Sequence, residues 1–163
     1  MSTRLARSPV EAVKYLSRRW AAGRKLVFMS ASENETSYSS VTRGVHVKVI
    51  PSYMGYSLPH HPGHYMFTYN VTITNQSDRP VQLLRRHWYI TDGHGQVEQV
   101  QGDGVIGQRP TILPGRSHEY SSYCPMRTEI GSMRGSYQMV TDEGEFFDAE
   151  IPAFPLVTPG AKN

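Results

Sequence analysis

Six residues near the middle of the chain, GDGVIG at 102–107, have the G-x-G-x-x-G spacing of a dinucleotide-binding loop. In such loops the glycines let the backbone approach a pyrophosphate, which rests on the amides at the N-terminus of the next helix. Here QRPTILPG follows the last glycine, and a helix cannot run through both Pro110 and Pro114. No Gly-Lys-Ser/Thr follows either, so the segment is not a P-loop. We therefore expect a loop between strands, in which the glycines allow positive φ or close backbone approach.

An anion site is the alternative for this segment. Consecutive backbone amides in a glycine-rich loop can bind a phosphate, and nearby arginines would add positive charge. The residues that would form this site are Gly102, Gly104, Gly107, Arg109 and Arg134.

The side chains that could bind a metal or attack a substrate lack the companions that these reactions need. His60, His61 and His64 lie close together, but no Cys, Asp or Glu accompanies them at a ligand spacing. Cys124 has no activating base that sequence spacing identifies, and the serine pair before it lacks a G-x-S-x-G context. We therefore predict no catalytic residue, no metal and no cofactor.

A cluster of arginine and aromatic residues occurs in the segment LLRRHW. Strand alternation places Leu84, Arg86 and Trp88 on one face, and Arg85 and His87 on the other. One arginine would then pack on the Trp88 ring or pair with an acid, a purely structural role. The alternative is a partner-binding or phosphate-binding role for Arg85, Arg86 and Trp88, and both interpretations stay open.

From residue 41 onward, apolar residues alternate with polar ones, which is typical of half-buried strands. About eight short strands at this spacing, without helical crossovers, favour an antiparallel β-sandwich over a barrel. We expect a loop at 51–63, PSYMGYSLPHHPG, with Pro51 ending the strand before it. The strands are expected at 41–50, 64–75, 81–92, 96–100, 111–113, 116–124, 133–140 and 145–151.

Four segments in sequence order resemble the ApaG domain family: LLRRHW at 83–88, GDGVIGQRP at 102–110, GSMRGSYQM at 131–139 and EIPAF at 150–154. The resemblance covers residues 41–157, with a tail at 158–163. It implies an all-β fold, an immunoglobulin/fibronectin-III-like antiparallel β-sandwich. It also implies a domain without an established catalytic activity, whose members share protein–protein binding.

Two functions follow from this resemblance. The first is a non-catalytic protein-interaction module, and therefore not an enzyme. The alternative is an anion- or nucleotide-binding protein that acts through the glycine loop at 102–109. In bacteria, the genes of family members lie beside the gene of an enzyme that cleaves dinucleoside polyphosphates. This neighbourhood links the alternative to dinucleoside polyphosphate metabolism.

Residues 1–40 lie outside the resemblance and carry most of the basic charge. Ser8 and Glu11 form a capping box, and the apolar residues that follow recur at helical spacing, so we predict a basic amphipathic helix and then a polar linker at 30–40. The basic residues of this leader are Arg4, Arg7, Lys14, Arg18, Arg19, Arg24 and Lys25.

Three interpretations of the leader stay open: a mitochondrial targeting segment, an arm that docks on RNA or on a large complex, and a solvated charged helix. We expect a mitochondrial protein, cytoplasmic otherwise, that acts as an accessory subunit of a complex such as the mitochondrial ribosome. The rest of the chain has ten basic and thirteen acidic side chains, so it is not a generally basic domain that coats nucleic acid. The single cysteine excludes an internal disulfide, and no apolar run is long enough to cross a bilayer.

Overall fold

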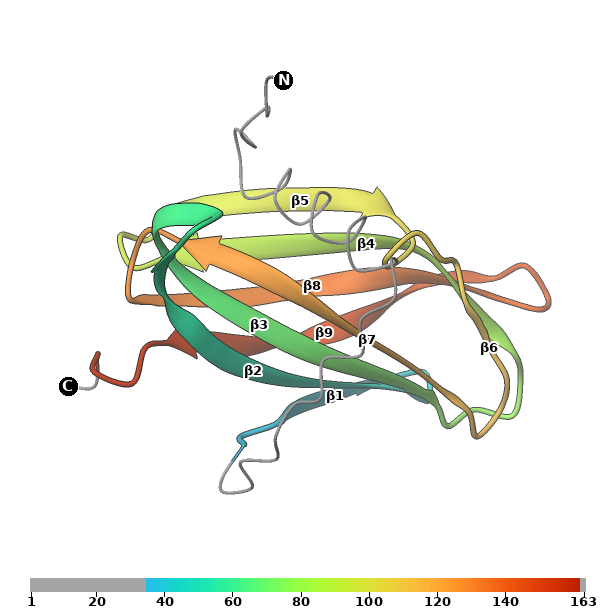
Figure 1. Ribbon diagram of the computed structural model, residues 1–163. Coiled ribbons are helices and arrows are strands. Elements are labelled where there is room, and N and C mark those ends of the chain that lie inside the picture. Colours follow the sequence, from blue (N-terminus) through green and yellow to red (C-terminus); the bar gives the residue numbers. More distant parts are fainter. Residues whose placement is uncertain (1–34, 162–163) are drawn as a thin grey trace.

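The computed structural model describes residues 35–161, and these form two antiparallel sheets packed face to face (Figure 1). One sheet has the order β1-β2-β3-β7, and the other has the order β5-β4-β8-β9 with β6 beside β4. This architecture confirms the all-β sandwich prediction. The strands are β1 (Tyr38–Thr42), β2 (Val45–Leu58), β3 (His61–Asn75), β4 (Val81–Asp92), β5 (Val97–Asp103), β6 (Thr111–Ile112), β7 (Ser117–Met126), β8 (Ile130–Thr141) and β9 (Phe146–Val157).

The leader helix and its seven basic residues, Arg4 to Lys25, lie outside the described residues. Strand β1 begins at Tyr38, inside the segment expected to be a linker. Within residues 35–161, no helix has the length and hydropathy needed to span a membrane.

The core lies between the sheets, where alternating residues of the strands meet. Val45, Val47 and Val49 of β2 are fully buried in this core, and so are Tyr137 and Met139 of β8 in the second sheet. Each such side chain contributes roughly 1.5–3 kcal/mol to the free energy of unfolding through burial alone. The alternation that was visible in the sequence therefore fixes which face of each sheet points inward.

The segment predicted to be a loop at 51–63 is mostly strand, so that prediction was wrong. Strand β2 continues to Leu58, β3 begins at His61, and Pro51 lies opposite Tyr69 in the ladder. Strand β1 pairs with β2 only as far as Val49, so Pro51 follows the paired part of that edge. A proline is tolerated where no neighbouring strand needs its missing N–H.

The side of the sandwich formed by β1 and β9 is closed by hydrogen bonds between the two sheets. The Ser40 hydroxyl donates to the carbonyl oxygen of Glu150 (2.6 Å). The Glu150 amide donates to the Thr42 hydroxyl (3.0 Å). These bonds occupy backbone groups of an edge strand that would otherwise need water.

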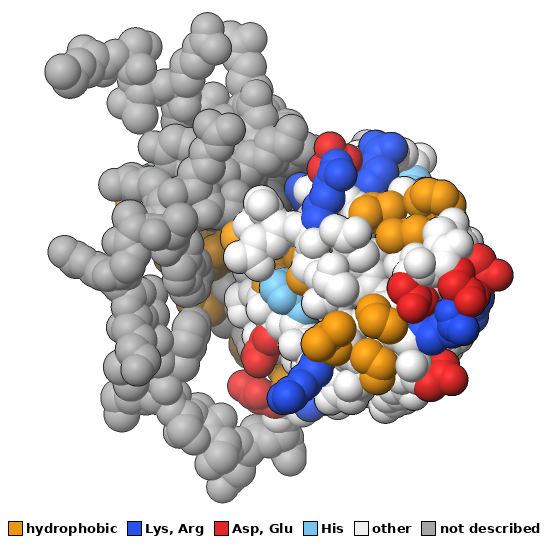
Figure 2. All heavy atoms as spheres, turned by 90° about the vertical axis from the view of Figure 1, so that its right-hand side faces the viewer, with side chains coloured by type: hydrophobic (Ala, Val, Ile, Leu, Met, Phe, Trp, Pro, Cys, Tyr) orange, Lys and Arg blue, Asp and Glu red, His pale blue; other side chains and the backbone are white. Residues whose placement is uncertain are grey.

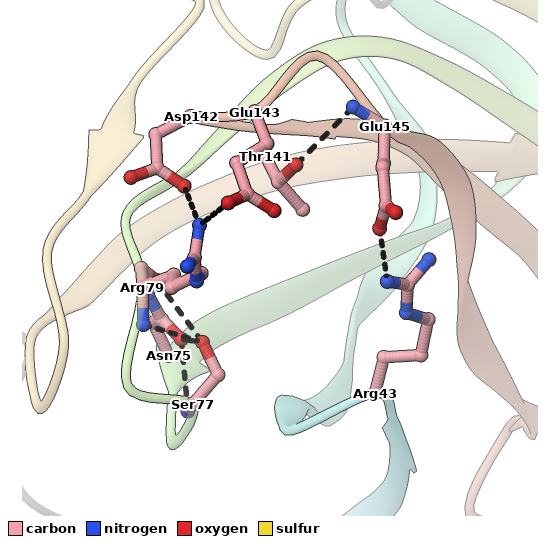
Figure 3. A network of polar contacts seen from close by, with 8 residues as sticks. All are labelled: Arg43, Asn75, Ser77, Arg79, Thr141, Asp142, Glu143 and Glu145. Atoms are coloured by element: carbon pink, nitrogen blue, oxygen red, sulfur yellow. Dashed lines mark hydrogen bonds and ion pairs between the residues drawn. The ribbon is translucent and has the colours of Figure 1, made fainter.

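A buried asparagine organises the turns at one end of the sandwich (Figure 3). The amide nitrogen of Asn75 donates to the carbonyl oxygens of Arg79 (2.6 Å) and Ile112 (2.9 Å). Its oxygen accepts from the amide and the hydroxyl of Ser77 (3.0 and 2.6 Å). Both donors and both acceptor positions of this side chain are therefore used. They hold the β3–β4 turn in shape and attach it to β6.

Ion pairs add a second set of contacts at this end. Arg79 pairs with Asp142 (3.4 Å) and Glu143 (2.5 Å) in the β8–β9 turn, and Arg43 pairs with Glu145 (2.7 Å) (Figure 3). All five side chains are about half exposed, so solvent screens each pair and its contribution to stability is small. The buried asparagine is the stronger constraint on this end.

We expect Asn75→Ala to lower the free energy of unfolding by about 1–3 kcal/mol, because it removes the side-chain donor to the Ile112 carbonyl and one of the two donors to the Arg79 carbonyl. Urea unfolding followed by circular dichroism measures this loss. Asn70→Ala is the matched control: Asn70 bonds Glu119 and Ser121 in an exposed setting, so its change should stay within about 0.5 kcal/mol. Equal losses in both variants would contradict the role given to Asn75.

Candidate functional site

The glycine loop makes a tight turn after β5, and β6 is the next element. Val105 and Gln108 exchange two backbone hydrogen bonds (2.8 and 3.0 Å). Between them, Ile106 and Gly107 both have positive φ, 48° and 71°. Two consecutive positive φ values are the mark of a type I′ turn, which favours glycine at its second position. The prediction of a loop between strands is confirmed for residues 104–110, whereas Gly102 and Asp103 belong to β5.

The other two glycines of the motif are required by close packing inside the protein. A Cβ atom on Gly104 would overlap the carbonyl oxygen of Gln108, and the φ of Gly104 is +59°. A Cβ atom on Gly102 would lie 2.8 Å from the guanidinium of Arg86. The Gly104 position therefore excludes a larger residue, and a side chain at Gly102 would displace the Arg86 guanidinium; neither reason involves a ligand.

Arg86 holds the loop from the core-facing side of β4. Its register partner is Gly102, and one guanidinium nitrogen donates to the carbonyl oxygens of Asp103 (3.0 Å) and Gly104 (2.7 Å). The loop amides of Gly104, Val105 and Gln108 donate to other carbonyls of the protein. The loop thus turns carbonyl oxygens toward an internal cation, and three of its amides are already hydrogen-bonded.

Arg85 and Arg109 meet on the outer side of the loop, around one carboxylate. The distances to the Asp103 oxygens are 3.4 Å for Arg85 and 3.3 Å for Arg109. All three side chains are more than half exposed. Because two cations share one acid, this part of the surface keeps an excess positive charge.

Arg134 does not join this group. It lies opposite Tyr89, with its guanidinium carbon 4.3 Å from the centre of the Tyr89 ring. Tyr89 is four residues along β4 from Arg85, a separation of about 13 Å. Arg134 therefore belongs to the outer face of the second sheet, with Tyr89 and the stacked ring of His87.

Trp88, which the sequence grouped with the arginines as a partner-binding residue, is only 3% exposed. Its ring lies 5.3 Å from that of Tyr69 and edge-on to Phe154, so it is a core residue. Leu84 was expected on the same face as Arg86 and Trp88, and this prediction was wrong. The register of β4 shifts between Leu83 and Arg85, so Leu83 takes the buried position instead. Of the proposed partner-binding residues, Arg85 is the exposed one.

A cluster of tyrosines, missed at the sequence level, lies between the sheets near Arg86. The hydroxyls of Tyr120 and Tyr137 are hydrogen-bonded to each other, and Tyr69 bonds Ser122. Burial raises the pKa of all three tyrosines, while the positive charge of Arg86 acts in the opposite direction. Tyrosine is enriched both in β-strands and at contact surfaces, so composition gave no signal for this cluster.

The cysteine and the histidines that could supply a nucleophile or metal ligands lie on β7 and around the start of β3. Cys124 is buried, and burial raises the pKa of its thiol to about 12, with the Glu98 carboxylate adding to the shift. A thiol in this setting stays protonated near neutral pH, whereas nucleophilic attack needs the thiolate. His61 and His64 lie near each other, with ring centres 6.4 Å apart. In the part of the chain that the structure describes, no three His, Cys, Asp or Glu side chains are arranged to hold a metal.

These features define an antiparallel β-sandwich domain whose glycine motif forms an arginine-bound turn. The chain belongs to the ApaG domain family, whose family model matches residues 57–141. It is 46% identical over 125 residues to Protein ApaG of Anaeromyxobacter dehalogenans, a match that spans 77% of this chain and 98% of that one. It is 48% identical over 126 residues to Protein ApaG of Allorhizobium ampelinum, spanning 77% and 97%.

Solved structures show the same fold. The crystal structure of an ApaA protein from Bordetella pertussis is 43% identical and superposes with a TM-score of 0.67, covering 72% of this chain and 95% of that one. The resemblance to the ApaG domain family seen in the sequence is therefore confirmed. The names of these relatives specify no activity or substrate.

We expect the packing of Gly102 against Arg86 to appear as non-additive stability. Gly102→Ala should destabilise the protein because the added methyl group displaces the guanidinium from its two carbonyl acceptors. In an Arg86→Ala background, the same glycine change should cost less, giving a coupling energy of about 0.5–3 kcal/mol in a double-mutant cycle measured by urea unfolding. Gly115→Ala is the control: no side chain lies near that position, so it should add to Arg86→Ala without coupling. Additive behaviour at Gly102 would refute the contact.

Proposed function

We propose that this chain is a non-catalytic protein-interaction module, an accessory subunit of a larger complex such as the mitochondrial ribosome. One observation carries the proposal: bulky apolar side chains lie on the surface at the end that holds the turns. Phe146 is 65% exposed and Leu113 is 54% exposed. Figure 2 shows apolar side chains gathered on this end, among Lys, Arg, Asp and Glu. Exposed apolar groups with a charged rim are typical of protein contact sites.

The reactive groups support a non-enzymatic role because the protein's own packing uses them. The thiol of Cys124 is buried and protonated. The glycine loop binds Arg86 through its carbonyl oxygens. His87 bonds Gln99 (2.9 Å) and stacks on Tyr89. In each case, contacts within the protein give the group a structural role.

Composition alone supports the mitochondrial part of the proposal. Residues 1–25 contain seven basic residues against one acidic residue, Glu11. A basic amphipathic segment of this kind can direct import or remain as an arm on an RNA-rich complex. Sequencing the mature N-terminus separates these two roles.

The partner proposal is tested with the full-length tagged chain, purified from its own cells together with its bound proteins. We expect recovery from the mitochondrial fraction with a multisubunit complex, and at least a tenfold loss of that complex in a Leu113→Glu, Phe146→Glu variant. Val97→Glu with Ile130→Glu is the matched control, because it adds the same charge at exposed apolar residues at the opposite end of the sandwich. Recovery of the chain alone, or equal losses in both variants, would reject this surface.

Salt tests the RNA version separately. If the basic segment contacts RNA, recovery should fall steeply as salt rises, because phosphate contacts release counterions. A flat salt response discards RNA contact and leaves the protein contact standing.

The second candidate function is anion or nucleotide binding at 102–109, favoured by the shared positive charge of Arg85 and Arg109. We expect calorimetry with pyrophosphate and adenine nucleotides to give no saturable heat, because Asp103 and the internal hydrogen bonds already occupy the site. Saturable heat that disappears in Arg109→Ala but persists in Arg134→Ala would favour the candidate. Gly104→Val is unsuitable here, since its side chain would disrupt the loop itself.

A further inference from the structure

The end of the β2–β3 hairpin, residues 53–65, is here named the β2–β3 arm. It lies within the longest stretch of the chain without Lys, Arg, Asp or Glu, residues 49–77. In most of this stretch the absence of charge reflects burial. In the arm it cannot, because the arm reaches the surface.

The apolar side chains of the arm are exposed. Met54 is 43%, Tyr56 is 55% and Leu58 is 37% exposed. Two register shifts and the positive φ of Gly55 and Ser57 twist this part of the hairpin. Figure 1 shows the hairpin curling away from the line of its sheet at this end.

The arm is held in one conformation by its own contacts. The rings of Tyr56 and Tyr65 lie 4.6 Å apart, and the Gly63 amide donates to the Ser57 hydroxyl (3.1 Å). At the base, Tyr65 hydrogen-bonds Glu129 of the β7–β8 turn. An apolar surface that is already ordered loses little conformational entropy on binding.

The polar groups of the arm add no fixed charge. His64 bonds the carbonyl oxygen of Pro62 (3.0 Å), and His60 and His61 flank it. Burial, followed by the neighbouring His64 and His60, lowers the pKa of His61, so this ring is neutral at pH 7. Without a Lys, Arg, Asp or Glu, the arm offers no fixed counter-charge to a nucleic acid or to a strongly charged peptide.

An uncharged apolar surface is compatible with a second copy of itself. In a two-fold dimer the same patch meets itself, so any charge near the axis faces a like charge. The opposite end of the sandwich, with Arg43, Arg79 and the acids of the β8–β9 turn, carries several such charges. The arm itself contains no Lys, Arg, Asp or Glu, and the Glu129 carboxylate at its base is hydrogen-bonded by Tyr65.

We infer that the β2–β3 arm is a self-association surface, on which Met54, Tyr56 and Leu58 pack against the same residues of a second copy. This inference goes beyond the proposed function, which concerns other proteins at the opposite end of the domain. The two surfaces do not share residues, so either one can fail while the other stands.

Sedimentation velocity of the full-length chain, over about a hundredfold range of concentration, tests the inference. We expect the mass to rise from one chain to two. Tyr56→Lys with Leu58→Lys should remain monomeric at every concentration, because two like charges from each copy would meet. Leu113→Lys with Phe146→Lys is the matched control and should dimerise like the wild type. A wild type that stays monomeric, or an arm variant that still dimerises, overturns the inference.

A second measurement covers the case in which the lysine variant fails to fold. Under mild oxidation, Leu58→Cys should form a disulfide-linked dimer, whereas Leu113→Cys should not; the native Cys124 is buried in both. Flotation with neutral phosphatidylcholine vesicles distinguishes a lipid surface as the occupant. Vesicle binding by a chain that stays monomeric, lost in the lysine variant, would overturn self-association.

Discussion

Arg86 sets the constraint on which the glycine loop depends. Its side chain shares the inner face of β4 with the buried Trp88, two residues along the strand. The guanidinium therefore needs hydrogen-bond partners close to the interior. An unpaired charge there would cost several kcal/mol, and no carboxylate bonds it among the ion pairs of residues 35–161. The carbonyl oxygens of Asp103 and Gly104 provide the compensation. Gly102 leaves room for the guanidinium to reach those oxygens, since a Cβ atom there would lie 2.8 Å from it.

The same G-x-G-x-x-G motif can therefore bind groups of opposite charge in two different folds. In a dinucleotide-binding loop, glycines expose amides to an anion at the start of a helix. In this sandwich, they let carbonyl oxygens surround a cation and allow a tight turn before a short strand. The sequence context separates the two cases, since Pro110 and Pro114 exclude the helix. The sequence did not reveal that Arg86 is this cation, because Arg86 comes next to the loop only when β4 pairs with β5.

Strand positions followed from alternation wherever a strand has one face in the core. Strand β4 begins at Val81 and ends at Asp92, the boundaries that the pattern predicted. The pattern failed at Pro51, because proline ends a strand only where a neighbour needs its N–H. Strand β9 shows the same effect, since it continues through Pro152 and Pro155 at the edge of its sheet.

The candidate site was less predictable than the fold because it depends on which strands become neighbours. Trp88 looked like a contact residue in the sequence, yet it packs against rings from β3 and β9. The hydrogen bond between Tyr120 and Tyr137 likewise joins strands of different sheets. No local pattern encodes such pairs. The leader can be interpreted only from its composition, and its role stays a prediction.

The edges of the sheets bear on how such a domain can bind partners. The β1 and β9 edges are tied to each other through Ser40, Thr42 and Glu150. On β5, Glu98 lies opposite Ile90, and burial raises the pKa of its carboxyl, so this edge strand carries an acid on its inner side. An inward-pointing charge on an edge strand disfavours the addition of another strand, because pairing would bury it further. At the β1, β5 and β9 edges, binding by side chains at the ends of the sandwich therefore fits this architecture better than the addition of a strand.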